Sequence, residues 1–234
     1  MSHFGLGLIS SAGVPGNDAF TKILLHMDGS NGGTTFTDVN AGGSSHTWTP
    51  SSATTSTAAA KFGPSSMLGS GGYISAPAHA DFNIGTNDAC FDFWLNNNGS
   101  SSAYGLAGQI DSGGTLGGTA FVMQKNGSGL ISVTMVNATV SATTTMTGTT
   151  NLNGTSGWVH IAWSKSGTTF RTFLNGVQEA TTTFASVNSV STPFHIGRTG
   201  NLGTALSGYI DEARLSIGAS RFTSNFTPPV AAYS

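Results

Sequence analysis

Short apolar segments separated by glycine-rich turns run through this chain, and no stretch of it has the spacing of an amphipathic helix. Residues 89–95 show the pattern well, because apolar and other side chains alternate along them. Successive side chains of a strand point to opposite faces, so Phe91 and Phe93 are expected on one face and Asp92 and Trp94 on the other. Strands of such a chain must pair antiparallel, because no segment can serve as the crossover helix of a parallel sheet.

Turn residues divide these segments into hairpins. Asn175-Gly176 favours the two-residue type I′ turn, in which both residues adopt positive φ. Residues 126–129, Asn-Gly-Ser-Gly, predict a second hairpin. We expect about twelve strands in all, arranged as a two-sheet antiparallel sandwich of the jelly-roll type. Besides residues 89–95, strands are predicted at residues 23–29, 72–76, 119–125, 129–136, 158–164, 169–174, 177–184, 193–197 and 207–217.

The composition is that of a folded domain with few charges. Hydrophobic residues make up 38% of the chain, with 14 phenylalanines and 4 tryptophans to build a core. Charged residues reach only 8%, against about 25% in ordinary soluble domains. Disordered chains combine few apolar residues with high net charge, so we predict one all-β domain over residues 21–234. Residues 1–20 lack the strand pattern and are interpreted as an extended N-terminal arm, and a frayed terminus without a role is the alternative.

The sequence argues against nucleic acids and membranes as partners. The eight lysines and arginines are spread singly along the sequence, whereas nucleic-acid binding needs several cations aligned on phosphates. No apolar run approaches the roughly 20 residues of a membrane-spanning helix, and the first residues lack the pattern of a signal peptide. Cys90 is the only cysteine, so we expect no internal disulfide and a small buried side chain at that position.

Catalytic motifs are missing from the sequence. Glycoside hydrolysis generally needs two carboxylates that face each other across the scissile bond. Glu179 lies in a predicted hairpin strand, and Glu212 directly follows Asp211, so these neighbours point to opposite faces. The sequence contains no nucleophile elbow, zinc-protease motif or phosphate-binding loop. We therefore predict that the protein is not an enzyme.

Asp211 is assigned a structural role. Alternation along residues 209–215 places it with Ala213 and Leu215 on the face expected to meet the core. A buried carboxylate needs a partner, and the candidates are backbone amides or Arg198.

The sequence offers little for a metal ion. Its six histidines are scattered, and His160, between the two tryptophans of its strand, is interpreted as a packed structural residue. Zinc is disfavoured because clustered histidines and cysteines are missing. Structural calcium stays open as an alternative, since Asp28 and Asp38 lie in polar turns where backbone carbonyls could complete a shell of oxygens. The same aspartates are also ordinary turn formers, and we expect neither a cofactor nor a metal.

Candidate glycan-binding residues are those expected on exposed loops. Residues 96–118 have the composition of long polar loops around one strand, and such loops on a rigid sheet frequently carry binding sites. They are equally consistent with plain connections. Trp48 lies in a polar segment that suggests exposure, whereas the other tryptophans sit inside strands and are assigned to the core. The candidates are Trp48, Asn97, Asn98 and Tyr104.

Eight short segments carry a family resemblance. They are residues 24–30 (LLHMDGS), 61–66 (KFGPSS), 72–74 (GYI), 158–162 (WVHIA), 173–177 (FLNGV), 194–197 (FHIG), 208–215 (GYIDEARL) and 220–229 (SRFTSNFTPP). In kind and order they resemble the concanavalin A-like, laminin-G-type jelly rolls of bacteriophage structural proteins, over residues 22–230. The resemblance implies a two-sheet jelly roll, usually non-catalytic, that binds glycans or proteins through its rim loops. Functional residues differ between family members, so no binding residue is transferred.

These features together lead us to expect a non-enzymatic phage virion protein, in the first place a capsid decoration or cement protein. The arm would dock on the major capsid protein or on a neighbouring subunit and stabilise the shell by mass action. The protein would then lie on the virion surface after synthesis in the cytoplasm of the host bacterium. The family resemblance favours a homo-oligomer, specifically a trimer. The candidate docking residues are Phe4, Leu6, Leu8, Ile9 and Val14.

The alternative is a glycan-binding adhesin or receptor-binding protein of a phage tail. Such a protein would contact a host surface glycan through exposed aromatic and amide side chains. The two functions are compatible, because a decorating jelly roll can also touch a host polysaccharide. An enzyme that acts on polysaccharide ranks last, since the carboxylate pair is missing.

Overall fold

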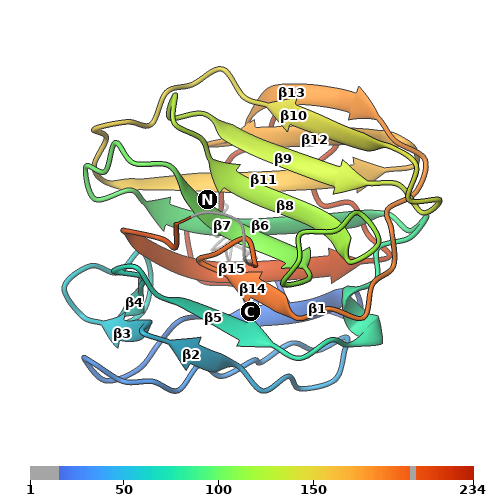
Figure 1. Ribbon diagram of the computed structural model, residues 1–234. Helices are drawn as coiled ribbons and strands as arrows, with labels where there is room; N and C mark the ends of the chain where they lie inside the picture. The colour runs from blue at the N-terminus through green and yellow to red at the C-terminus, as the bar shows by residue number, and fades with distance from the viewer. Residues whose placement is uncertain (1–15, 201–203) are drawn as a thin grey trace, which may run out of the picture.

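Two antiparallel sheets lie face to face in the computed structural model, which describes residues 16–200 and 204–234 (Figure 1). The all-β sandwich predicted from the sequence is thereby confirmed. The eight-stranded sheet has the order β13-β12-β11-β6-β15-β4-β3, and β1 also pairs with β15. Its strands are β1 (Thr21–Leu25), β3 (Thr54–Ser56), β4 (Ser66–Leu68), β6 (Ala89–Asn96), β11 (Trp158–Ser166), β12 (Thr169–Leu174), β13 (Val177–Thr183) and β15 (Tyr209–Ile217).

The seven-stranded sheet has the order β10-β9-β8-β7-β14-β5-β2. Its strands are β2 (Thr49–Ser51), β5 (Tyr73–Ala76), β7 (Tyr104–Ile110), β8 (Thr119–Lys125), β9 (Ile131–Val136), β10 (Thr143–Thr147) and β14 (Phe194–Ile196). A 3-10 turn, η1 (Ala80–Phe82), follows β5. The described residues thus form fifteen strands rather than about twelve, and among those missed are the three-residue strands β2, β3 and β4. Within the described ranges, no helix has the length and apolar character needed to cross a membrane.

Strand β6 shows how the sequence builds the core. Phe91 and Phe93 enter the space between the sheets, where Phe91 meets Phe121 of β8 and Phe194 of β14 at ring-centroid distances of 6.4 and 5.6 Å. Asp92 points to the opposite side, as the alternation predicts. Aromatic pairs in this geometry contribute about 0.5–1.5 kcal/mol each beyond the area they bury. The alternating phenylalanines therefore tie the two sheets together.

Both predicted hairpins are present. Asn175 and Gly176 have φ values of 49° and 78° between β12 and β13, as the type I′ turn requires. Residues 126–129 connect β8 to β9.

A β-bulge in β15 overturns the face predicted for Asp211. Glu212 has a φ of 52°, and the pairing of β15 with β6 shifts between Asp211 and Arg214. Asp211 is paired with Trp94, which lies outside the core between the sheets, whereas Ala213 joins that core. Because an extra residue reverses the side-chain alternation, Asp211 does not share the core face with Ala213.

The partner predicted for Asp211 is found among backbone amides. Its Oδ2 accepts hydrogen bonds from the amides of Lys61 and Phe62 at 2.7 and 3.1 Å. Arg198, the other candidate, instead lies over the ring of Tyr73.

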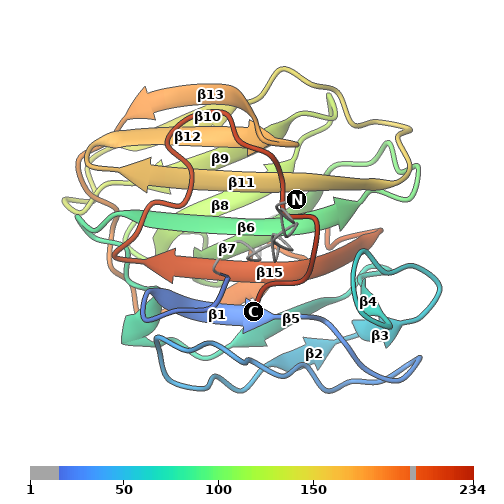
Figure 2. The ribbon, with the colours of Figure 1, turned by 180° about the vertical axis from the view of Figure 1, so that it is seen from behind.

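The outer face of the eight-stranded sheet is covered by residues 218–234, which we call the C-terminal strap (Figure 2). Its Phe222 and Phe226 stack with ring centroids 3.7 Å apart and pack on Phe173 of β12. Cys90 belongs to the same apolar cluster and is fully buried, as predicted. The strap therefore gives this sheet a second, smaller core on its far side.

A buried ionic network fixes the end of the strap to the sheet. Asp92 accepts hydrogen bonds from Nε and Nη2 of Arg214 at 3.0 and 3.2 Å, and from the hydroxyl of Tyr233. His160 Nε2 lies 3.2 Å from the same carboxylate, which confirms the structural role predicted for this histidine. Burial opposes ionisation of Asp92, but the charge of Arg214 and the bond from His160 outweigh it and lower its pKa to about 2.

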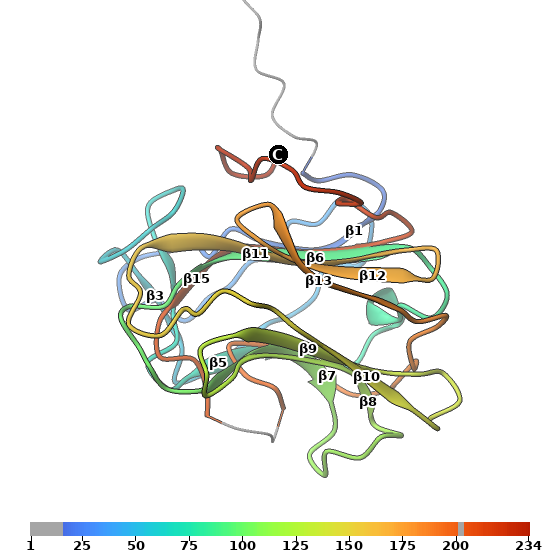
Figure 3. The ribbon, with the colours of Figure 1, turned by 90° about the horizontal axis from the view of Figure 1, so that it is seen from above.

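The two ends of the described chain meet on this outer side (Figure 3). The amides of Gly16 and Asn17 donate to the carbonyl of Ser234, and Asp18 pairs with Arg221 at 2.7 Å. Residues 16–20, assigned to the arm from the sequence, thus pack against the domain. The predicted docking residues Phe4, Leu6, Leu8, Ile9 and Val14 lie outside the described residues.

Candidate functional site

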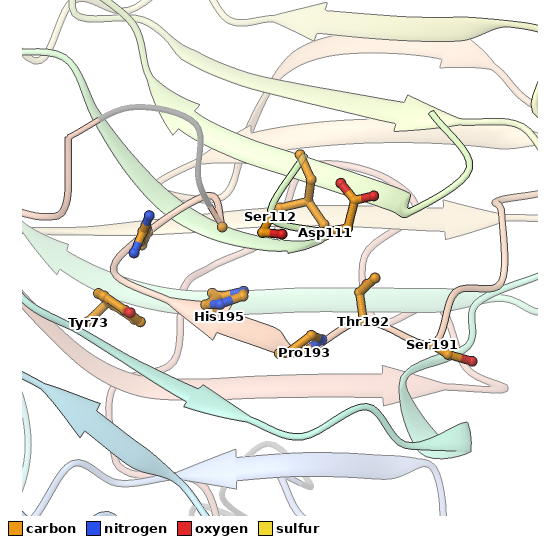
Figure 4. A pocket seen from close by; sticks show the side chains of 10 residues that line it. Tyr73, Asp111, Ser112, Ser191, Thr192, Pro193 and His195 are labelled. Carbon is orange, nitrogen blue, oxygen red and sulfur yellow. The ribbon is translucent and has the colours of Figure 1, made fainter. Parts of the chain in front are cut away.

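A cavity of about 510 Å³ opens on the outer face of the seven-stranded sheet (Figure 4). Its volume falls within the roughly 300–1,000 Å³ of small-ligand pockets. Strands β5 and β14 supply the floor, while the end of β7 and the loop after β14 supply the walls. The lining residues are Tyr73, Ile110, Asp111, Ser112, Ser191, Thr192, Pro193, His195, Arg198 and Gly200.

Alternation along β14 places a histidine on the cavity floor. Phe194 and Ile196 enter the core, so His195 between them faces outward. Tyr73, on the neighbouring strand β5, lies beside it with the two ring centroids 5.7 Å apart. The floor therefore presents two planar rings side by side (Figure 4).

Glycine allows the loop after β14 to cross β7 closely enough to form a wall. A Cβ on Gly105 would lie only 2.5 Å from the backbone nitrogen of Thr199, so a larger residue would displace the loop. Backbone hydrogen bonds from Gly197 to Leu106 and from Gly105 to Thr204 hold the loop in place. The same loop carries Arg198, whose guanidinium carbon lies 4.8 Å from the centroid of the Tyr73 ring.

The cavity brings together a cation, a carboxylate and a neutral imidazole. No carboxylate of the described residues forms an ion pair with Arg198. Asp111 accepts hydrogen bonds from the hydroxyl and the amide of Thr115, which hold its pKa below the usual value. Burial, assisted by the charge of Arg198, lowers the pKa of His195, so its imidazole is neutral at pH 7. Hydrogen-bond donors and acceptors thus surround an aromatic floor.

Two smaller hollows extend the cavity along the same face. A hollow of about 210 Å³ shares Ser191 with the cavity, and a hollow of about 170 Å³ shares Ala78 and His79 with the first hollow. The three depressions form a row from Arg198 to His46. A row of this kind suits an extended ligand better than a compact one.

At the far end of this row, His46 forms a cluster with His79 and Asp81, which follow it by more than thirty residues in the sequence. His46 Nε2 and His79 Nδ1 lie 3.4 and 3.2 Å from Oδ2 of Asp81. His46 Nδ1 lies 2.7 Å from Oδ2 of Asp38, and its side chain is only 4% exposed. The cluster forms because the segment before β2 lies against η1, where Ser44 donates its amide to Asp81. The spacing of these histidines in the sequence did not predict that they would meet.

Trp48 is not the exposed aromatic residue predicted from its polar neighbours. Its side chain is 5% exposed and packs edge-on against Phe194, with ring centroids 6.2 Å apart. Burial alternates along residues 45–51, so Trp48 points inward while Thr47 and Thr49 stay exposed. The exposure was predicted from the polar composition of the segment, without regard to the alternation of its side chains between the two faces.

Asn97 and Tyr104 are buried, against the exposure expected of them, and bond to each other. The Tyr104 hydroxyl donates to Oδ1 of Asn97, whose Nδ2 donates to the carbonyls of Ser100 and Leu152. These bonds fasten the loop before β7 to the body of the domain. Asn98 is exposed, with a φ of 50°, but does not line the cavity. The structure therefore brings none of the four candidates into the cavity.

The aspartates considered for calcium already have partners in the protein. Oδ1 of Asp38 accepts the amides of Leu24 and Asn40, while Oδ2 faces His46. Burial raises the pKa of Asp28, although the amide of Ser65 opposes the change. Neither arrangement tests the calcium alternative, which stays an expectation.

The cavity residues were missed, although their sequence carried a usable signal. Tyr73 and His195 lie in two of the segments that support the family resemblance, at outward positions of short strands. Nothing in the sequence shows that these strands are neighbours, because β5 and β14 are separated by more than a hundred residues.

Comparison with known proteins supports the architecture. The sequence profile of the concanavalin A-like lectin/glucanases superfamily matches residues 68–219, more than half of the chain. Among curated proteins, none matches this chain in sequence.

Solved structures with this fold include binding domains. The binding domain of Paraclostridial Mosquitocidal Protein 1 has a TM-score of 0.63 at 12% identity, over 84% of this chain and 48% of its own. The binding domain of Botulinum Neurotoxin DC, in complex with SialylT, has a TM-score of 0.60 at 10% identity over the same shares. The present chain thus spans about half the length of these toxin domains. Domain 4 of AbnA, an extracellular GH43 arabinanase from Geobacillus stearothermophilus, in complex with arabinotriose, has a TM-score of 0.59 at 16% identity, over 86% of this chain and 94% of its own.

Proposed function

Since this chain belongs to the concanavalin A-like lectin/glucanases superfamily, we propose that it is a non-enzymatic carbohydrate-binding domain. The proposed site is the 510 Å³ cavity on the outer face of the seven-stranded sheet, which we call the glycan cavity. The observation that carries the proposal is Arg198, an arginine without a carboxylate partner among the described residues, held over an aromatic ring at a ligand-sized cavity.

The chemistry of the glycan cavity suits a sugar. Sugars present hydroxyl groups around an apolar ring, and pockets that recognise small ligands place a few polar groups on a largely apolar lining. Here Arg198 supplies several N–H donors in a rigid fork, while Ser191 supplies a hydroxyl. Tyr73 and His195 supply apolar ring surface beneath them. The planar fork of Arg198 also fits a carboxylate, so an acidic sugar is the favoured ligand.

Two comparisons support the same class of ligand. The structure of the neurotoxin domain contains SialylT, and that of AbnA domain 4 contains arabinotriose. Both share the fold of this chain, and each is one domain of a larger protein. The common element is the binding of a saccharide by a jelly roll.

The absence of catalysis is part of the proposal. Glycosidases position two carboxylates on either side of the scissile bond. Among the described lining residues, Asp111 is the only carboxylate, and both of its oxygens accept hydrogen bonds from Thr115. A second acid or base for hydrolysis is therefore missing from the described lining.

Binding to purified oligosaccharides tests the proposal. A glycan array identifies ligands, and calorimetry then compares acidic sialylated oligosaccharides with neutral ones such as arabinotriose. We expect the wild-type domain to bind an acidic glycan and Arg198→Ala to weaken that binding at least tenfold, about 1.4 kcal/mol. Tyr73→Ala removes the surface that supports Arg198 and is expected to act similarly.

Two matched variants complete this experiment. Tyr73→Phe keeps the ring and should bind within about twofold of wild type. Arg171→Ala removes an arginine from β12 on the other sheet and should leave binding unchanged. Failure to bind any glycan, or equal binding by all variants, would contradict the proposal.

We also propose that this domain is displayed on a phage virion surface as a decoration protein. The support is the resemblance of residues 208–215 and 220–229 to phage virion members. The geometry is compatible with display, because Gly16 lies at the outer face of the eight-stranded sheet and the glycan cavity opens on the other sheet. The proposed partners are the major capsid protein and further copies of this chain in a trimer.

A further inference from the structure

The cluster at the end of the row of hollows has the dimensions of a metal site. In a tetrahedral zinc site with bonds of about 2.0–2.2 Å, ligand atoms lie roughly 3.3–3.6 Å apart. The distances from Oδ2 of Asp81 to His46 Nε2 and His79 Nδ1 are 3.4 and 3.2 Å. One potential ligand atom from each of the three residues lies within 4.8 Å of the others. A modest closure of the two imidazoles around Asp81 would complete the geometry.

His46 provides an independent sign that a cation belongs there. Its side chain is 96% buried, with an exposed fraction of 4%, and its Nε2 has no hydrogen-bond partner among the described residues. Nδ1 faces Asp38 at 2.7 Å, a contact that favours a proton on Nδ1 and leaves the Nε2 lone pair 3.4 Å from Oδ2 of Asp81. A buried lone pair next to a carboxylate oxygen is unfavourable unless a cation lies between them.

We propose that His46, His79 and Asp81 bind one divalent transition-metal ion, with Zn²⁺ as the first candidate. Two imidazoles and a carboxylate are a ligand set that zinc accepts, and calcium prefers oxygen ligands alone. Asp38 is the positioning residue, because carboxylates that accept a proton from a ligating histidine fix its tautomer and orientation.

The surroundings leave room for the remaining ligand. The hollow of about 170 Å³ is lined by both histidines of the cluster, so a water molecule or a ligand hydroxyl can reach the ion. His79 is 40% exposed, and in this structure its Nδ1 accepts the amide of Asp81 at 3.1 Å. Binding of the ion exchanges that hydrogen bond for a metal bond, and the exposed ring has space to move.

Zinc titration of the full chain, treated beforehand with a chelator, tests this proposal. We expect calorimetry to show one Zn²⁺ per chain with micromolar or tighter affinity. Co²⁺ at the same site should give the visible absorption of a tetrahedral complex, and Ca²⁺ should not bind there. His79→Asn keeps an acceptor for the amide of Asp81 and removes the imidazole, so it should lower zinc affinity at least tenfold. Asp38→Asn should lower it by about 10–100-fold.

The control is His3→Gln, which removes a histidine outside the described residues and should leave zinc affinity unchanged. The proposal is overturned if wild type does not bind zinc, or if His79→Asn binds it as tightly as wild type.

Discussion

Asp211 is the residue through which stability depends most directly on pH near neutrality. Burial raises its pKa to about 7, although the amides of Phe62, Lys61 and Glu212 favour the ionised form. The unfolded chain ionises this aspartate near 3.9. Between these two values the native state holds a proton that the unfolded state has lost. Rising pH therefore destabilises the fold, and the cost is complete only above the native pKa.

The expected result is a fall in the free energy of unfolding of about 2–3 kcal/mol between pH 5 and pH 8. His26 acts in the same direction, because its contact with Glu212 raises its pKa and that stabilisation is lost as pH rises. Urea unfolding of wild type and Asp211→Asn at several pH values separates the two contributions. The wild type should lose more stability than the variant across this range, and parallel profiles would refute the assignment.

At the scale of elements, the β12–β13 hairpin and the C-terminal strap depend on each other. The strap passes so close to the turn that the amide of Phe226 donates to the carbonyl of Gly176 at 2.9 Å. A Cβ at Gly176 would lie 1.9 Å from the carbonyl oxygen of Phe226, and the φ of this glycine is 78°. Only glycine fits both the turn and the neighbour.

Gly176→Ala should therefore lower the free energy of unfolding by well over the 1–2 kcal/mol that positive φ alone costs a residue with a side chain. Gly154→Ala is the matched control, since its φ is 71° and its Cβ would meet nothing within 4 Å. Chemical denaturation should show the control losing only about 1 kcal/mol. Equal losses of stability in the two variants would mean that the strap can move away from this turn at little cost in free energy.

The sequence predicted elements whose signal is local. Alternation along β6 and the Asn175-Gly176 turn each depend on a few consecutive residues, and the structure confirms both. The exposure predicted for Trp48 was wrong because its segment is polar in composition but alternates between buried and exposed side chains. The face predicted for Asp211 was wrong because a bulge reverses the alternation there. The bulge depends on the pairing of β15 with β6, and the periodicity of the sequence does not show it.

The residues of the two candidate sites could not be predicted from short segments of the sequence, for a different reason. Tyr73, His195 and Arg198 meet because β14 is inserted between β5 and β7. His46 and His79 meet because β2 pairs with β5 at the edge of the same sheet. Each site is made by strand order, and strand order is a property of the whole chain.

At the scale of the molecule, the virion proposal predicts that the segment before Gly16 holds the domain on a shell. The comparison is between full-length protein and a chain that begins at Gly16, each mixed with shells that lack this protein. The shorter chain keeps the Asp18–Arg221 ion pair, so it should fold normally. Co-sedimentation is expected for the full chain and not for the shorter one.

Circular dichroism and glycan binding should be the same for both chains, which separates loss of attachment from loss of folding. If neither chain binds the shells, the decoration role is wrong, and tail structures become the next partner to examine. Binding by both chains would move the contact to the folded domain itself.

The contact between Gly16 and Ser234 has a consequence for how the described domain can be built into other proteins. Gly16 and Ser234 are joined by a hydrogen bond on the sheet opposite the glycan cavity. A host polypeptide could therefore accept the whole domain within a single surface loop, because the entry and exit points need almost no separation. The inserted domain would be attached to that loop by both of its ends, with the glycan cavity facing away from the host.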